Sequence, residues 1–112
     1  MGESGRKRGV VVFEELHQGD ILIVERIRHP VLVVSKDFFN LTGEIIACPI
    51  FKNSTVGPLH IFITANEFQG YVQCEKLALL DMNIRGYKKV GRIQLMDRIN
   101  ISDAVQGIFE YV

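Results

Sequence analysis

The chain has 112 residues, of which 47% are hydrophobic and 23% are charged, and 13 Lys and Arg residues balance 13 Asp and Glu residues. A chain of this size and hydrophobic content forms one folded domain, which excludes two independent cores and disorder of the whole chain. Because the charges balance, composition gives no general argument for a nucleic-acid-binding protein, although it allows a local basic patch.

The N-terminal residues 1–9 are rich in Gly, Ser and charge, and we expect them to be a mobile leader before a single domain over residues 10–112. The apolar run Val10–Phe13 is too short for a signal peptide, and no run approaches the ~20 apolar residues of a membrane helix. Cys48 and Cys74 cannot form a disulfide framework of the secreted kind. These features predict a reduced, cytoplasmic protein without a membrane segment.

Short β-branched runs separated by turn residues dominate the first half of the chain. Residues 21–24 predict a first strand, and residues 31–34 predict a second strand that follows Pro30. The connection between them is short, so the two strands are expected to pair as a hairpin. Residues 35–40 favour a helical turn, and residues 44–50 favour a third strand.

The second half of the chain predicts further short strands and a closing helix. After a loop over residues 51–58, strands are expected at 59–64 and 71–74, with 77–80 continuing the latter and a weaker strand at 90–93. Thr64–Glu67 has the spacing of a capping box and predicts a very short helix.

Helical spacing then relates Ile101, Val105, Ile108, Phe109 and Val112, with Asn100 or Ser102 as the expected cap. The pattern indicates a mainly β fold, a small sheet or barrel closed by a C-terminal helix.

Metal and cofactor sites are not supported by residue spacing. His17, His29 and His60 show no ligand spacing to each other or to the two cysteines, which lie in apolar strands. No glycine-rich phosphate loop precedes a helix, and no serine lies in a nucleophile elbow. We therefore expect neither a metal nor a cofactor.

Two basic clusters and one acid–base pair are the candidate functional features. The first cluster lies in the predicted hairpin turn and consists of Arg26, Arg28 and His29. The second cluster lies near residue 90 and consists of Arg85, Lys88, Lys89 and Arg92. The acid–base pair, Glu75 and Lys76, follows the fifth strand. Solvated turns and ordinary surface ion pairs account for such groups in many proteins. Alternatively, the clusters contact phosphates, with Phe51 or Tyr87 stacking on a base.

Several segments, taken in order, resemble the MazF/PemK/Kid family of toxins from type II toxin–antitoxin systems. They are Gly19-Asp20-Ile21, His29–Ser35, Phe39-Asn40, Pro49, Gly70–Glu75 and Asp81–Gly86 followed by Lys88-Lys89. The resemblance implies an SH3-like small β-barrel with a C-terminal helix, assembled as a homodimer and bound by a cognate antitoxin. It also implies a growth inhibitor that cleaves single-stranded RNA, without a metal, by attack of a 2′-hydroxyl on its own phosphodiester.

The chain departs from the family pattern at the expected site. His29 replaces the family's Arg before Pro, Phe51-Lys52 stand near its Thr-Ser pair, and Gln73 and Glu75 replace a catalytic Arg and its Asp. One hypothesis is a ribonuclease with a rearranged site. In it His29 acts as the base or the acid, Glu75 takes the opposite role, and Arg85, Arg28 or Lys52 supplies the cation.

The alternative is a degenerate binding module that holds nucleic acid (RNA or DNA), an antitoxin peptide or a protein target such as gyrase. In either case the nucleic-acid contacts are expected at Arg26, Arg28, Phe51, Lys52, Lys88 and Lys89. Ile108, Phe109 and Val112 are candidates either for the dimer contact or for the core.

Overall fold

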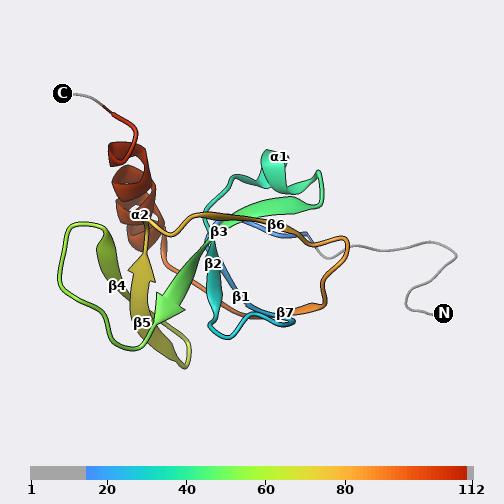
Figure 1. Cartoon of the computed structure of the whole chain (residues 1–112), viewed down its shortest axis with the longest axis horizontal. Coiled ribbons are helices and arrows are strands. Elements are labelled where there is room, and N and C mark those ends of the chain that lie inside the picture. The colour runs from blue at the N-terminus through green and yellow to red at the C-terminus, as the bar shows by residue number, and fades with distance from the viewer. Residues whose placement is uncertain (1–14, 111–112) are drawn as a thin grey trace, which may run out of the picture.

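The computed structural model describes residues 15–110, which form seven strands and two helices (Figure 1). The predicted leader, Val10–Phe13 and Val112 lie outside the described residues. The elements in chain order are β1 (Asp20–Val24), β2 (Val31–Val33), α1 (Asp37–Asn40), β3 (Glu44–Phe51), β4 (His60–Ala65), β5 (Phe68–Gln73), β6 (Ala78–Asp81), β7 (Tyr87–Arg92) and α2 (Leu95–Gly107). The expected mainly β fold with a C-terminal helix is confirmed.

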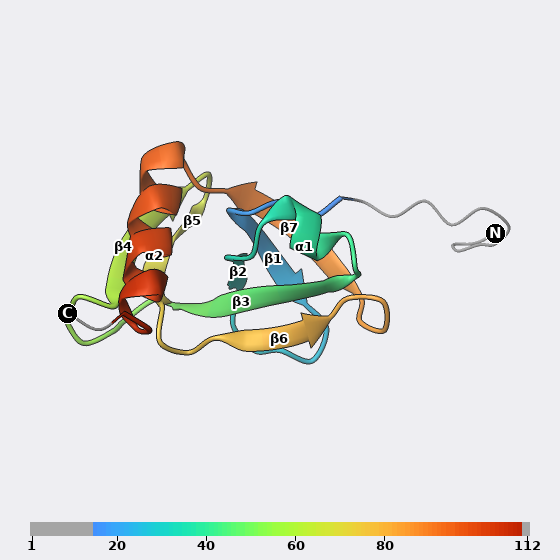
Figure 2. The same cartoon turned by 90° about the horizontal axis from the view of Figure 1, so that it is seen from above.

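The strands form one curled antiparallel sheet. Its hydrogen-bonded order is β4-β5-β3-β2-β1-β7, and β6 pairs with β3 off this path. The long strand β3 belongs to both parts of the sheet, because Glu44–Ala47 pair with β6 while Ile50 and Phe51 pair with β5. The sheet therefore wraps as a half-barrel, with β4 and β5 on one side and β1 and β7 on the other (Figures 1 and 2).

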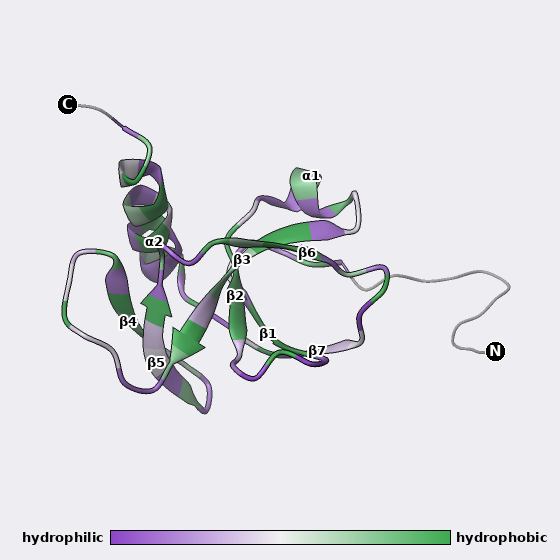
Figure 3. Cartoon of the chain, viewed as in Figure 1, coloured by the Kyte–Doolittle hydropathy of each residue, from purple (hydrophilic) through white to green (hydrophobic). Residues whose placement is uncertain are grey.

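The hairpin expected from the first two strands is confirmed. β1 and β2 pair antiparallel, with Ile21 opposite Leu32. Apolar residues alternate between two buried faces along these strands, because neighbouring side chains of a strand point to opposite sides of a sheet. Ile21 and Leu32 pack in a cluster with Ile101 of α2, whereas Leu22 packs in a second cluster with Ile45. Figure 3 shows the resulting hydrophobic β1, β2 and β3 beside a hydrophilic β1–β2 turn.

Two local predictions are wrong. Residues 77–80 do not continue the fifth strand, since Ala78–Asp81 form the separate strand β6 on β3. Thr64–Glu67 is not a helix, because Asn66 has a φ of 56° and reverses the chain between β4 and β5. Asparagine adopts this left-handed conformation more readily than other non-glycine residues, and here that preference outweighs the capping-box spacing.

Helix α2 lies against β4 and β5 (Figure 2). It begins at Leu95, after Gln94, so Asn100 and Ser102 lie inside the helix and the expected cap is wrong. Ile101 is the buried residue of α2. Ile108 and Phe109 follow the helix and are 39% and 68% exposed, so they are not core residues. No helix within residues 15–110 is long and apolar enough to cross a lipid bilayer.

Candidate functional site

The end of β3 and the facing part of β5 form the floor of the candidate site. Phe51, the last residue of β3, lies opposite Tyr71 of β5. The two strands approach closely, because a Cβ added at Gly70 would lie 2.8 Å from the carbonyl oxygen of Phe51. Glycine is therefore required at position 70 for the strands to pair at this point. Because the strands are antiparallel, this pairing brings the residues that follow β3 next to the beginning of β5, where Lys52 and Asn53 line one pocket with Phe68 and Gln69.

The ring of Phe51 is contacted from two sides. The ring of His29, from the β1–β2 turn, lies with its centroid 4.2 Å from that of Phe51 at an interplanar angle of 58°. The ammonium of Lys76 lies 5.1 Å from the centroid of Phe51, within the range of a cation–π contact. A pocket of about 480 Å³ opens beside this aromatic pair, and its lining residues are Arg28, His29, Pro30, Ile50, Phe51, Lys52, Asn53, Phe68 and Gln69. We call it the Phe51 pocket.

A polar network surrounds His60, the first residue of β4. Nε2 of His60 is 2.8 Å from Oε2 of Glu75, and Nδ1 of His60 is 2.6 Å from the carbonyl oxygen of Thr55. The hydroxyl of Ser54 lies 3.0 Å from Nδ1 of His60 and accepts a hydrogen bond of 3.1 Å from the Gln73 amide. The network therefore ties the β3–β4 loop to the residues at the end of β5.

The electrostatics of His60 and Glu75 are coupled. The carboxylate of Glu75 and the carbonyl of Thr55 both favour the protonated imidazole, so the pKa of His60 is raised above 6.5. The hydrogen bond from His60 and a backbone hydrogen bond lower the pKa of Glu75 below 4.5. Each member of the pair thus favours the charged form of the other.

The buried cysteines are not candidate nucleophiles. Burial raises the pKa of Cys48 to about 12 and that of Cys74 to about 11. Both thiols therefore stay protonated near neutral pH, and a thiol is a poor nucleophile.

Arg85 lies apart from the Phe51 pocket. It lines a different pocket of about 310 Å³ together with Glu25, Arg26 and Ile84. The β1–β2 turn separates the two pockets, since Arg26 lines one and Arg28 lines the other. Arg26 has a φ of 67° at this turn. The structure thus brings His29, Phe51 and Lys52 together but does not add Arg85 to them.

The two lysines of β7 have different surroundings. Nζ of Lys89 lies 3.3 Å from a carboxylate oxygen of Asp20, which is 3% exposed. Lys88 is exposed and lies opposite Ile23 on the sheet. Lys89 is therefore committed to an internal ion pair, whereas Lys88 is available to a ligand.

Sequence reasoning did not propose His60, Ser54 or Thr55 for this site. The register of the β4–β5 hairpin, which turns at Asn66 and Glu67, places His60 opposite Gln73. A turn prediction at Asn66 in place of a helix would have given the same register.

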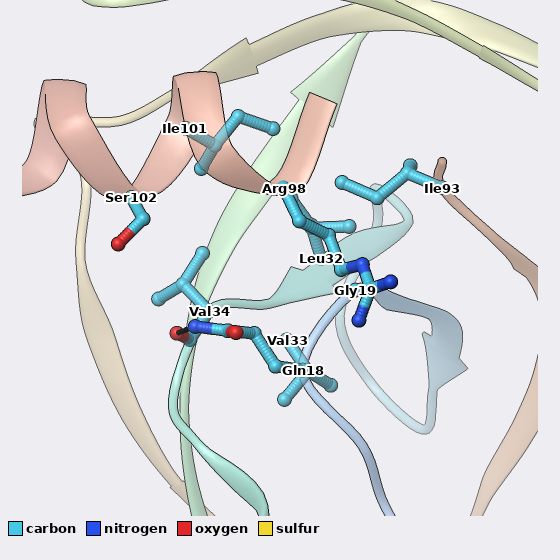
Figure 4. Close-up of a pocket in the computed structure, with 9 residues that line it drawn as sticks. All are labelled: Gln18, Gly19, Leu32, Val33, Val34, Ile93, Arg98, Ile101 and Ser102. Atoms are coloured by element: carbon cyan, nitrogen blue, oxygen red, sulfur yellow. Dashed lines mark hydrogen bonds between the residues drawn. The ribbon is translucent and has the colours of Figure 1, made fainter. Parts of the chain in front are cut away.

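A separate small cavity lies where α2 covers the sheet (Figure 4). Its lining includes Gly19, Ile101 and Arg98, and its volume of about 10 Å³ leaves space for about one water molecule. A Cβ at Gly19 would lie 2.5 Å from Cδ of Arg98. This cavity is a packing feature, too small for a substrate. Within residues 15–110, no group of three His, Cys, Asp or Glu side chains is placed to hold a metal ion.

Comparison with solved structures shows the same fold in several toxins. A MazE–MazF complex from Deinococcus radiodurans has a TM-score of 0.78 at 19% identity, over 87% of this chain and 98% of that chain. A mycobacterial endoribonuclease in complex with its cognate antitoxin has a TM-score of 0.68 at 18% identity, over 87% and 99%. The Mycobacterium tuberculosis toxin MazF-mt6 has a TM-score of 0.67 at 14% identity, over 80% and 95%.

At these low identities the solved structures show the fold alone, and a match to a family model is needed to show the family. No curated protein sequence is significantly similar to the chain. The model that matches describes the PemK-like, MazF-like toxin of type II toxin–antitoxin systems, and it covers residues 7–109. The resemblance seen in the sequence is thereby confirmed, and the chain belongs to the PemK-like, MazF-like toxin family of type II toxin–antitoxin systems.

Proposed function

We propose that the chain is the ribonuclease of a toxin–antitoxin pair, a growth inhibitor that cleaves single-stranded RNA at the Phe51 pocket without a metal. The observation that carries this proposal is the aromatic pair of His29 and Phe51, which lies beside the ammonium of Lys76. Aromatic rings stack on unpaired bases, and a nearby cation neutralises the phosphate. Family membership is consistent with this activity.

The proposed reaction uses His29 and Lys52, which line the pocket, together with Glu75 and Lys76, which follow β5 and adjoin the pocket through the contact of Lys76 with Phe51. The carboxylate of Glu75 accepts the proton of the 2′-hydroxyl, whose oxygen attacks the adjacent phosphorus. The bond from phosphorus to the 5′-oxygen breaks, and that oxygen takes a proton from His29. Lys76 and Lys52 balance the negative charge of the phosphorane. They take over the role of the family's catalytic Arg, whose position is occupied by Gln73 in this chain. The products are a 2′,3′-cyclic phosphate and a 5′-hydroxyl.

The proposed assembly is a homodimer that a cognate antitoxin inhibits. Structures of the same fold include a MazE–MazF complex and an endoribonuclease with its antitoxin. The outer side of α2 and the residues after it carry exposed apolar side chains, which a second copy would cover: Leu95, Met96, Ile99, Ile108 and Phe109. Sedimentation equilibrium tests the homodimer.

Gln73 supports a second candidate, the binding module without catalysis. Its amide donates to Ser54, and a neutral amide cannot replace a catalytic cation. In this case the Phe51 pocket holds nucleic acid or an antitoxin peptide without cleaving it.

One experiment separates the two candidates. The purified protein is incubated in EDTA with single-stranded RNAs of varied sequence and with the matching 2′-deoxy strands. We expect discrete RNA fragments that end in 2′,3′-cyclic phosphate and no cleavage of the 2′-deoxy strands. Binding of RNA without any cleavage at high protein concentration would favour the binding module.

A further inference from the structure

His60 is a histidine of the site that the proposed reaction does not use. Its side chain is 14% exposed and lies between the β3–β4 loop and the end of β5. The side chain of its partner Glu75 is 38% exposed. Glu75 therefore faces solvent in front of His60, which is the more enclosed member of the pair.

The hydrogen-bond partners determine the protonation of His60. Nδ1 lies 2.6 Å from the carbonyl oxygen of Thr55, and Nε2 lies 2.8 Å from the carboxylate of Glu75. A carbonyl and an ionised carboxylate accept hydrogen bonds and donate none. Both acceptors are satisfied at once only when each ring nitrogen carries a hydrogen, so these two contacts favour the imidazolium.

The charged groups that face His60 come from one segment. Glu75 favours the imidazolium, and the neighbouring Lys76 opposes it. The groups that the β3–β4 loop and β5 contribute are neutral: Ser54, Thr55 and Gln73. The balance is in favour of the imidazolium because Glu75 is in direct contact.

We propose that His60 is a positioning residue of the ribonuclease site: as an imidazolium, it binds one oxygen of Glu75 and leaves the other oxygen directed to the RNA. This inference rests on the proposed ribonuclease function and adds a residue to it. His60 itself does not contact the substrate. It holds the carboxylate ionised and in a single orientation, which a flexible surface glutamate does not have by itself.

The arrangement makes RNA cleavage sensitive to alkaline pH. When His60 loses its proton, the ring can donate to only one of its two acceptors, and it loses the positive charge that attracts the carboxylate of Glu75. The contact becomes weaker, and Glu75 is held less firmly in one orientation. Cleavage is therefore expected to decrease as the pH rises through the raised pKa of His60.

The test compares His60→Gln and Glu75→Gln with a matched control, His17→Gln. His17 forms a similar contact of 2.7 Å with Asp37, the first residue of α1, which has no part in the proposed reaction. Cleavage of one RNA in EDTA is measured from pH 5.5 to 9, together with the titration of the histidine ring signals by NMR. We expect His60→Gln to cleave about 10- to 100-fold more slowly, because a misplaced catalytic group has an effect of this size. Its alkaline decrease should be smaller than that of the wild-type protein, because His60 no longer contributes to it.

The control variant should keep the wild-type rate and pH profile. Glu75→Gln should abolish most cleavage and return the ring pKa of His60 toward 6.5. His60→Asn provides a second variant, and circular dichroism verifies that each variant is folded.

The possible failures are distinguishable. If the wild-type protein cleaves RNA and folded His60 variants cleave at the same rate with the same pH profile, the role of His60 is overturned while the ribonuclease function stands. If the wild-type protein cleaves no RNA, the proposed function is wrong and the role of His60 falls with it.

Discussion

The ring centroids of His29 and Phe51 lie 4.2 Å apart, although the two residues are 22 positions apart in the chain. The contact joins the β1–β2 turn to the end of β3, because β2 pairs with β3 and brings Val31 opposite Pro49. It creates a half-exposed aromatic surface beside basic residues. A surface of this kind suits unpaired nucleotides better than a double helix, in which the faces of the bases are covered.

Phe51→Ala should weaken the binding of single-stranded RNA by about 1 to 3 kcal/mol, the contribution of one stacked base. Fluorescence anisotropy with a 2′-deoxy strand measures this loss without cleavage. The control is Phe62→Ala, which removes an exposed ring that contacts Tyr71 and does not line the Phe51 pocket. Equal losses for both variants would contradict the assignment of the pocket.

Lys76→Ala should slow RNA cleavage by about 100-fold, because its ammonium is the cation beside the proposed reacting phosphate. Arg85→Ala should reduce binding more than the rate of cleavage at saturating RNA, since Arg85 lines the other pocket. Single-turnover kinetics separates the two effects. If Arg85→Ala lost more of the cleavage rate than Lys76→Ala, Arg85 and not Lys76 would be the catalytic cation.

Lys89→Met should destabilise the protein by about 1 to 3 kcal/mol, because the buried carboxylate of Asp20 loses its closest cationic partner. Lys88→Met is the matched control, with an exposed side chain on the same strand, and should leave the free energy of unfolding almost unchanged. Urea denaturation measures both values. If Lys88 contacts phosphate, Lys88→Met should weaken RNA binding more than Lys89→Met does.

The ion pair of His60 and Glu75 should stabilise the fold within a limited pH window. The raised pKa of His60 gives a contribution that is complete below pH 6.5 and is lost as the pH rises through the folded-state pKa. The lowered pKa of Glu75 gives a contribution that is present above pH 4.5 and is lost as the pH falls through its folded-state pKa. The difference in Tm between wild type and His60→Gln should therefore be largest between pH 4.5 and 6.5.

Cys48 and Cys74 should not react with a thiol reagent such as DTNB at pH 8 while the protein is folded. Both are buried, and their raised pKa values of about 12 and about 11 leave almost no thiolate. Both should react once denaturant is added. Rapid reaction in the native state would show that the sheet opens around β3.

The amino-acid sequence alone was enough to predict most of the strands, the C-terminal helix and the family. Alternating β-branched runs and short turns predicted β1, β2 and β3, since a strand needs only its own apolar pattern and a nearby partner. The basic cluster at the hairpin, the acid–base pair after the fifth strand and the departures from the family pattern identified His29, Phe51 and Glu75 as candidates.

Which of these side chains meet depends on how the strands pair in three dimensions. His60 contacts Glu75 because the left-handed turn at Asn66 sets the register of β4 and β5, and Arg85 lies apart because the β1–β2 turn separates two pockets. Pairing between strands distant in sequence depends on the packing of the whole core. For this reason the pattern of a single segment could not predict these contacts.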